Sequence, residues 1–145
     1  MATTSRAPQL ASRLRLAVAR TARRLRQEAG GGLSPTLSAA LASIDNHGPL
    51  TPSELADRER IKRPTATRLI ASLEQDGLVA RTSDPSDGRS SLIATTPEGR
   101  DLMRTLRTRK DAYLARRLAK LTAGERETLA RAADLLERLL EEDEA

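Results

Sequence analysis

The segment Asp84–Arg89 (Asp-Pro-Ser-Asp-Gly-Arg) constrains the fold of this 145-residue chain more than any other part of the sequence. Short strand-like runs lie on both sides of it, at residues 79–83 and 90–95. Pro85 and Gly88 favour a tight turn between these runs. The pattern therefore predicts an antiparallel hairpin with an arginine at its tip.

Three residues of the segment are expected to support this hairpin. Asp84 can form a local turn through its side chain, and Asp87 can hold a neighbouring arginine or backbone amide in place. Gly88 would allow the loop to close tightly. These supports would present Arg89 outward. The plainer alternative is a solvated arginine on an ordinary turn.

The residues directly before the hairpin, 51–77, predict two short helices joined by a turn. Thr51–Glu54 is a capping box, in which the threonine hydroxyl accepts from the glutamate amide and the carboxylate reaches back. The second helix is expected to open at Pro64, with Arg63 as a poor cap, and to stop at Gly77. A helix-turn-helix followed by such a hairpin is a winged helix. The predicted fold class is thus mainly α with a small β-hairpin wing.

Amphipathic helices are expected on both sides of this lobe. Apolar residues at helical spacing predict a first helix over Pro8–Glu28, and Ser34-Pro35 begins the next one. Gly30–Gly32 between them is interpreted as a flexible linker. A long helix should run from Pro97 to Lys120, and a capping box at residues 122–125 opens the last helix.

The terminal helices suggest an intertwined homodimer, because their amphipathic faces need a partner surface. We interpret residues 1–33 as an N-terminal dimerisation helix and linker, 34–96 as a DNA-binding lobe, and 97–145 as C-terminal dimerisation helices, within one structural domain. The chain has no Phe or Trp and one Tyr. Its core must therefore use smaller aliphatic side chains, which bury less area, and a dimer would supply the missing burial.

The formal net charge of +5 favours a polyanionic partner. Residues 1–30 carry seven arginines against one glutamate, whereas residues 121–145 carry three arginines against eight acidic residues. A chain polarised in this way should orient itself on DNA rather than coat it. The plainer alternative is that arginine is simply abundant in this chain.

Several classes of function are excluded by missing residue types. The absence of cysteine excludes disulfides, thiolate metal sites and thiol redox sensing. His47, the single histidine, cannot form a metal site alone. Without a phosphate-binding glycine loop or a catalytic cluster, we expect neither enzymatic activity nor a cofactor. No apolar run suits a signal peptide or a membrane span, so a cytoplasmic location without membrane association is expected.

The second helix of the helix-turn-helix has the size and polarity to lie in a major groove of double-stranded DNA. Its uncapped N-terminus and adjacent basic residues suit a phosphate, an arginine can contact a guanine edge, and threonines suit a thymine methyl or a phosphate oxygen. The wing arginine suits a narrow minor groove. The alternative for the helix is a face of ordinary solvated residues. The residues expected to contact DNA are Lys62, Arg63, Thr65, Thr67, Arg68, Ser72 and Arg89.

The order of these features resembles the MarR family of bacterial transcription regulators, over nearly the whole chain from about Leu10 to Leu140. The most specific segments are Leu73–Arg81, Asp84–Arg89 and Thr96–Gly99. The resemblance implies a homodimer with interlocked terminal helices and two winged-helix lobes. Each lobe would place its recognition helix in a major groove of a pseudo-palindromic operator, and the family usually represses by occluding a promoter.

By position, Thr65, Thr67 and Arg68 match the groove-facing residues of that family, and Arg89 matches the wing contact. Many members release DNA when a small, often phenolic or anionic, effector binds near the junction of dimer and lobe. Arginines of the first helix and Tyr113 are candidate contacts for such a molecule. The cysteines of oxidant sensors and the ligand sets of zinc sensors are missing here.

Two alternatives stay open on the sequence alone. A regulator without any small-molecule ligand is one, since a single tyrosine makes an aromatic-lined pocket hard to build. A non-specific architectural DNA-binding protein is the other, because basic charge by itself permits it.

Overall fold

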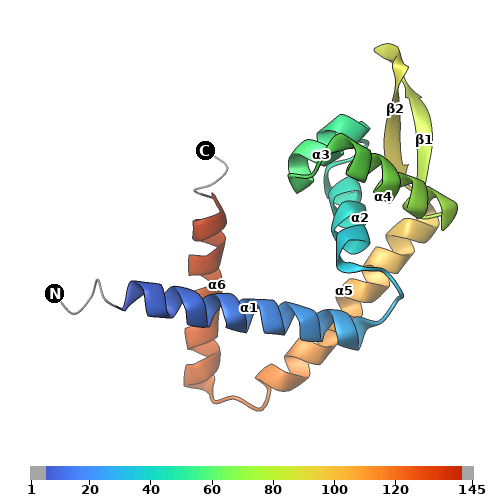
Figure 1. The fold of residues 1–145 in the computed structure, drawn as a ribbon. Coiled ribbons are helices and arrows are strands. Elements are labelled where there is room, and N and C mark those ends of the chain that lie inside the picture. Colours follow the sequence, from blue (N-terminus) through green and yellow to red (C-terminus); the bar gives the residue numbers. More distant parts are fainter. Residues whose placement is uncertain (1–5, 142–145) are drawn as a thin grey trace. The chain divides into compact units, whose positions relative to one another are not determined.

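A computed structural model describes residues 6–141, except for the side chains of Asp84, Asp87 and Ser90. The chain divides into two compact units, Met1–Lys110 and Asp111–Ala145, and each is described by itself. Most described residues are helical, and a two-stranded hairpin completes the fold, which confirms the predicted class (Figure 1). The elements are α1 (Ala7–Ala29), α2 (Pro35–His47), α3 (Pro52–Glu59), α4 (Arg63–Gln75), β1 (Val79–Asp84), β2 (Asp87–Thr95), α5 (Pro97–Leu118) and α6 (Ala123–Glu141).

The helix starts follow the capping residues of the sequence. Ser34 caps α2 by accepting from the amide of Leu37 at 3.2 Å, and Thr51 caps α3 by accepting from the amide of Glu54 at 3.1 Å. The carboxylate of Glu54 differs from the expected capping box: it accepts from the Thr51 hydroxyl, at 3.2 Å. The box therefore satisfies one helix amide through the threonine, with the glutamate fixing that hydroxyl.

The core of the first unit is aliphatic and lies where three helices meet the base of the hairpin. Its largest fully buried side chains come from α2, α3, α4 and β2, and they are Leu41, Ile44, Leu55, Ile70, Leu73 and Ile93. Because these core side chains are aliphatic and none is aromatic, the helices can pack closely against one another. This core fixes α3 and α4 against the hairpin, which sets the geometry of the helix-turn-helix.

The hairpin β1–β2 extends away from the helices of the lobe (Figure 1). Its regular register runs from Val79 opposite Thr95 to Ser83 opposite Ser91, and it shifts before the pair of Asp84 and Asp87. At its base, Leu50 adds a short third strand segment: its amide donates to Ile93 O at 3.0 Å, and the Ile93 amide donates back at 2.7 Å. The wing is therefore anchored to the chain that links α2 to α3.

The turn of this hairpin is tighter than the sequence predicted. Pro85 and Ser86 alone form it, because strand pairing continues to the residues on either side. Arg89 is the third residue of β2 and lies near the tip, beyond the regular part of the ladder, which ends at the pair of Ser83 and Ser91. Gly88 also has no left-handed backbone, and an added Cβ would meet nothing within 4 Å, so the turn does not require a glycine there.

The start of α5 explains why Thr96 and Gly99 are needed. The hydroxyl of Thr96 donates to Gly77 O at 2.6 Å and accepts from the amide of Gly99 at 3.1 Å. Gly99 is buried, and a Cβ there would lie 2.1 Å from Leu78 O. The pair thus docks α5 directly onto the loop that leads from α4 into the wing.

Gly30, Gly31 and Gly32 all have positive φ angles, of 65°, 94° and 74°. Their backbone therefore adopts conformations that other residues rarely take. A Cβ at Gly31 would lie 2.6 Å from a methyl carbon of Leu106. The glycines interpreted as a linker thus form a defined bend at the end of α1, where the Arg109 guanidinium also donates to Ala29 O at 2.9 Å.

Candidate nucleic-acid interface

The N-terminus of α4 carries two exposed basic residues and no side-chain cap. The structure corrects the cap position by one residue: Lys62 has an extended backbone and is the cap, whereas Arg63 already lies in the first turn. Pro64 lies in this first turn, where its missing amide costs no hydrogen bond within the helix. The predicted absence of a side-chain cap is confirmed, so the first amides of α4 face outward beside two cations.

The outward face of α4 carries the predicted groove residues in two environments. Thr67 and Arg68 are exposed, whereas Thr65 and Ser72 are half-buried. The Thr67 hydroxyl donates to Arg63 O at 3.0 Å, so its proton is engaged within the helix. The guanidinium of Arg68 approaches the Thr65 hydroxyl at 3.5 Å, so Arg68 extends along the helix surface towards its N-terminus.

A polar cleft of about 280 Å³ lies between α3, α4 and the hairpin. We call it the interface cleft, and it is lined in part by Thr51, Ser53, Arg63, Thr67, Arg81 and Arg89. It brings together three of the predicted contacts, from α4 and from the wing. The remaining four predicted contacts, Lys62, Thr65, Arg68 and Ser72, do not line it.

Sequence reasoning missed Thr51, Ser53 and Arg81 as parts of this cleft. Thr51 was recognised only as a helix cap, and Arg81 only as the end of a family-like segment. Their approach depends on the way that α3 packs against α4 and on the strand register, neither of which local spacing reveals. Arg81 also pairs with Glu74 of α4: its Nε lies 3.1 and 3.2 Å from the two carboxylate oxygens.

The expected support of the wing by Asp84 and Asp87 falls on side chains outside the described residues, so it stays a prediction. Arg89 is exposed and faces the interface cleft from β2. The strand register shifts beyond the pair of Ser83 and Ser91, so Arg89 lies in the irregular end of the hairpin rather than in its regular ladder. The wing arginine is therefore presented by the end of β2 next to the turn.

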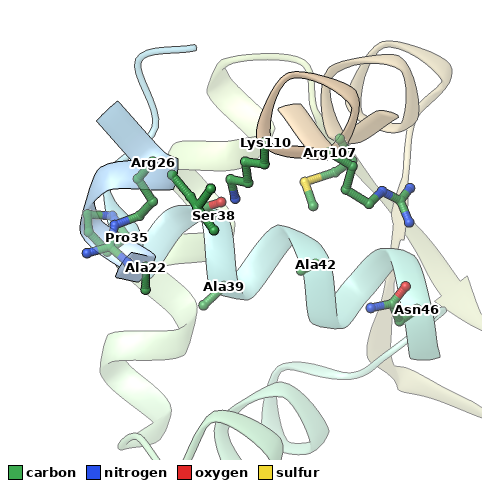
Figure 2. Close-up of a pocket in the computed structure, with 11 residues that line it drawn as sticks. Ala22, Arg26, Pro35, Ser38, Ala39, Ala42, Asn46, Arg107 and Lys110 are labelled. Carbon is green, nitrogen blue, oxygen red and sulfur yellow. The ribbon is translucent and has the colours of Figure 1, made fainter. Parts of the chain in front are cut away.

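A second cavity, of about 390 Å³, lies between α1, α2 and the first part of α5. Its lining is mainly apolar but includes Arg26, Arg107 and Lys110. Figure 2 shows Arg26, Ser38 and Lys110 gathered at one end of it, with Arg107 and Asn46 at the other. Tyr113 is not among its lining residues.

Arg107 connects this cavity to the end of α2. Its guanidinium lies 3.6 Å from the carboxylate of Asp45, which also lies 3.9 Å from the guanidinium of Arg100. The Asp45 side chain is only 12% exposed, so this pairing is better shielded from solvent than the pairs Arg24–Glu28, Arg81–Glu74 and Arg104–Asp101. It joins α5 to the segment that leads into Leu50 and the base of the wing.

Two further features of the described residues bear on function. Among the described residues, no group of three or more histidine, cysteine or acidic side chains could hold a metal ion. His47 is exposed at the end of α2. Within the same part of the chain, no helix combines the length and apolar character needed to cross a membrane.

Comparison with known proteins agrees with this geometry. The MarR family model matches residues 33–91, which hold the whole helix-turn-helix and most of the wing. An HTH-type transcriptional regulator of Mycobacterium bovis is 42% identical over 135 residues, covering 92% of this chain and 94% of that protein. The chain belongs to the MarR family.

Two further relatives extend the comparison beyond the mycobacterial one. The HTH-type transcriptional repressor MdtR of Bacillus subtilis is 34% identical over 113 residues, covering 78% of this chain and 73% of that one. The crystal structure of a putative transcriptional regulator from Pseudomonas aeruginosa has a TM-score of 0.81 and 36% identity, covering 91% and 94% of the two chains. This MarR protein is thus a DNA-binding transcription regulator of winged-helix fold.

Proposed function

We propose that this protein is a dimeric, sequence-specific repressor that occludes a promoter by binding a pseudo-palindromic operator. The observation that supports the proposal most strongly is the interface cleft, in which α4 and the wing present cations on one side of the lobe. A helix in the major groove and a strand arginine in the adjacent minor groove require this common side. The relative named as a repressor, MdtR, agrees with the proposed direction of regulation.

In this proposal the contacts of α4 divide into two kinds. Lys62 and Arg63 bind phosphates beside the uncapped helix N-terminus. Arg68 reaches a base edge, with Thr65, Thr67 and Ser72 lining the same groove face. Arg89 enters the minor groove, and Asp84 and Asp87 remain proposed supports of the wing.

The proposed homodimer uses the terminal helices, as the division into segments 1–33, 34–96 and 97–145 implies. In α1, Leu10 and Val18 are 59% and 47% exposed, and among the described residues of α6 none is buried. Apolar side chains that remain in water along whole helices mark an association surface. A second copy would cover them and set the two lobes on neighbouring major grooves of the operator.

We further propose that the cavity between α1, α2 and α5 receives the effector. An apolar lining with three cations suits a small anionic molecule with an apolar body. Such an anion would compete with Asp45 for Arg107 and so loosen the contact between α5 and the base of the wing. A repressor of this kind needs no enzymatic activity, and it would act in the cytoplasm, where bacterial DNA lies.

The proposal is tested by fluorescence-anisotropy binding to the DNA upstream of the protein's own gene, with random duplex as competitor. We expect two protomers per site and an affinity for the operator at least about 10³ times that for random DNA. Equal affinity for all sequences would identify an architectural DNA-binding protein instead. If the upstream DNA is not bound specifically, selection from a random library replaces it before that conclusion is drawn.

A further inference from the structure

Arg81 lies in β1 and directs its side chain into the interface cleft beside Arg63 and Arg89. Three guanidinium groups thus line one cleft of about 280 Å³. A cleft lined by several basic side chains attracts anions. The lining therefore suits an anionic group of a ligand.

The contact between Arg81 and Glu74 fixes how that arginine is presented. Both carboxylate oxygens lie within 3.2 Å of Nε, so the carboxylate occupies one edge of the guanidinium. The two Nη groups at the other edge are the ones suited to a bidentate contact with an anion. Glu74 therefore restricts the side chain to one orientation in advance of binding.

Stability alone does not account for this pair. Both side chains are 38% exposed, and ion pairs at such sites contribute little to stability. The pair also joins α4 to β1, the two elements that must keep a fixed spacing on a duplex. Orientation of Arg81 explains the placement of the acid beside a basic cleft better than stabilisation does.

We propose that Arg81 is a further DNA-backbone contact and that Glu74 is its positioning residue. The interface cleft would receive one phosphate of the duplex, held by Arg81, Arg63 and the hydroxyl of Ser53. This inference rests on the proposed binding of DNA by the same face, but it does not require the operator. A phosphate contact acts on every sequence alike, so any duplex measures it.

The test measures binding of the full-length protein to a short random-sequence duplex by anisotropy, over a series of salt concentrations. Arg81→Gln should weaken binding several-fold and lower the slope of log K against log salt by about 1. The matched control is Arg104→Gln, because Arg104 is also an exposed arginine paired with an acid, Asp101, at 3.3 Å. Circular dichroism checks that each variant keeps its fold.

The variant Glu74→Met distinguishes a positioning role of Glu74 from the effect of its negative charge on DNA binding. Removal of an acid near DNA should tighten binding if charge alone matters, and Asp101→Met measures that effect away from the cleft. A positioning role predicts the opposite sign, namely weaker binding by Glu74→Met. It also predicts that Arg81→Gln combined with Glu74→Met is no weaker than Arg81→Gln alone, since the acid acts through the arginine.

Each result decides a separate point. Wild-type protein that binds no duplex would overturn the proposed function together with this inference. Wild-type binding with Arg81→Gln equal to Arg104→Gln would overturn the inference alone. Tighter binding by Glu74→Met would remove the positioning role of Glu74.

Discussion

The lobe buries its large apolar side chains, whereas the terminal helices leave many of theirs exposed. In the lobe, α2, α3, α4 and β2 enclose a core in which Leu41 and Leu73 are fully buried. Along α1 and α6, by contrast, leucines such as Leu139 remain more than half exposed. The difference shows that the lobe holds its shape by its own contacts, and the exposed leucines of the terminal helices support the proposed association with a second copy.

The largest expected effect falls on the enclosed core. Leu41→Ala should destabilise the lobe by about 2–5 kcal/mol, because a fully buried leucine leaves a cavity. Chemical denaturation at several protein concentrations measures this loss. Leu135→Ala, at a position 54% exposed in α6, is the control and should change the stability of the lobe little. Equal losses would show that the two regions do not differ as described.

The exposed helices should respond through association rather than through folding. Leu14→Asp should weaken the dimer by roughly 2–4 kcal/mol, since each of two copies loses part of a buried leucine and gains a desolvated charge. Leu16 is the control in the same helix: at about 100° per residue it lies away from the stripe of Leu10, Leu14 and Val18.

Sedimentation equilibrium measures both variants of α1. Leu16→Asp should leave the dimer intact although Leu16, at 49%, is more exposed than Leu14, at 36%. Comparable dissociation by the two variants would show that the apolar stripe is not the association surface. A wild-type monomer would remove the proposed dimer altogether.

Two glycines offer a sharper comparison. Gly99 lies at the junction between the lobe and α5, and Gly124 lies at the start of α6. Gly99→Ala should destabilise by about 1–3 kcal/mol, because its Cβ would lie 2.1 Å from a backbone oxygen. At Gly124 the nearest atom to an added Cβ is 4.0 Å away, so Gly124→Ala should be neutral or stabilising. Thermal unfolding of both variants measures the difference. A harmless Gly99→Ala would mean that α5 can move away from the wing.

The wing should affect binding without affecting folding. Arg89→Ala should weaken operator binding by about 1–3 kcal/mol while the melting temperature stays unchanged. Arg60→Ala provides a matched exposed arginine at the end of α3, outside the lining of the interface cleft. An unchanged affinity of folded Arg89→Ala would remove the wing arginine from the mechanism.

The sequence predicted those parts of the fold that local chemistry decides. Ser34, Thr51 and Thr122 cap helices as expected, and the alternation around residues 79–95 predicted the hairpin. At the tip the strand register shifts between Ser83 and Asp84, and β2 begins at Asp87, earlier than the predicted run of residues 90–95. A pattern of residue types does not contain that register.

The candidate site was predicted less completely than the fold. Arg63, Thr67 and Arg89 were identified from their positions on one helix and one hairpin, and the structure brings them to the same cleft. Arg81 was missed because its role depends on Glu74, seven residues earlier and on another element. Pairs that meet only through tertiary packing leave no periodic signal in the chain.

The smallest expected effect distinguishes the two capping boxes. At α6 the box is complete: the Thr122 amide donates to the Glu125 carboxylate at 2.9 Å, and the Glu125 amide donates to the Thr122 hydroxyl at 3.1 Å. The backbone amide of Thr122, with its hydroxyl, lowers the pKa of Glu125 below the usual value for a glutamate. At α3 the glutamate meets only a hydroxyl.

A lowered pKa in the folded state stabilises the fold at pH values above the unfolded pKa, and this contribution is lost as the pH falls through the folded pKa. The start of α6 should therefore loosen in acid, and Glu125→Gln should remove that part of the pH dependence. Amide hydrogen exchange at residues 123–126, compared between neutral and acidic pH after correction for intrinsic rates, measures it. Glu127→Gln is the control, because Glu127 lies on the same helix outside the box. If both variants keep the wild-type pH dependence, the reciprocal hydrogen bond does not stabilise the start of α6, and the two boxes are equivalent.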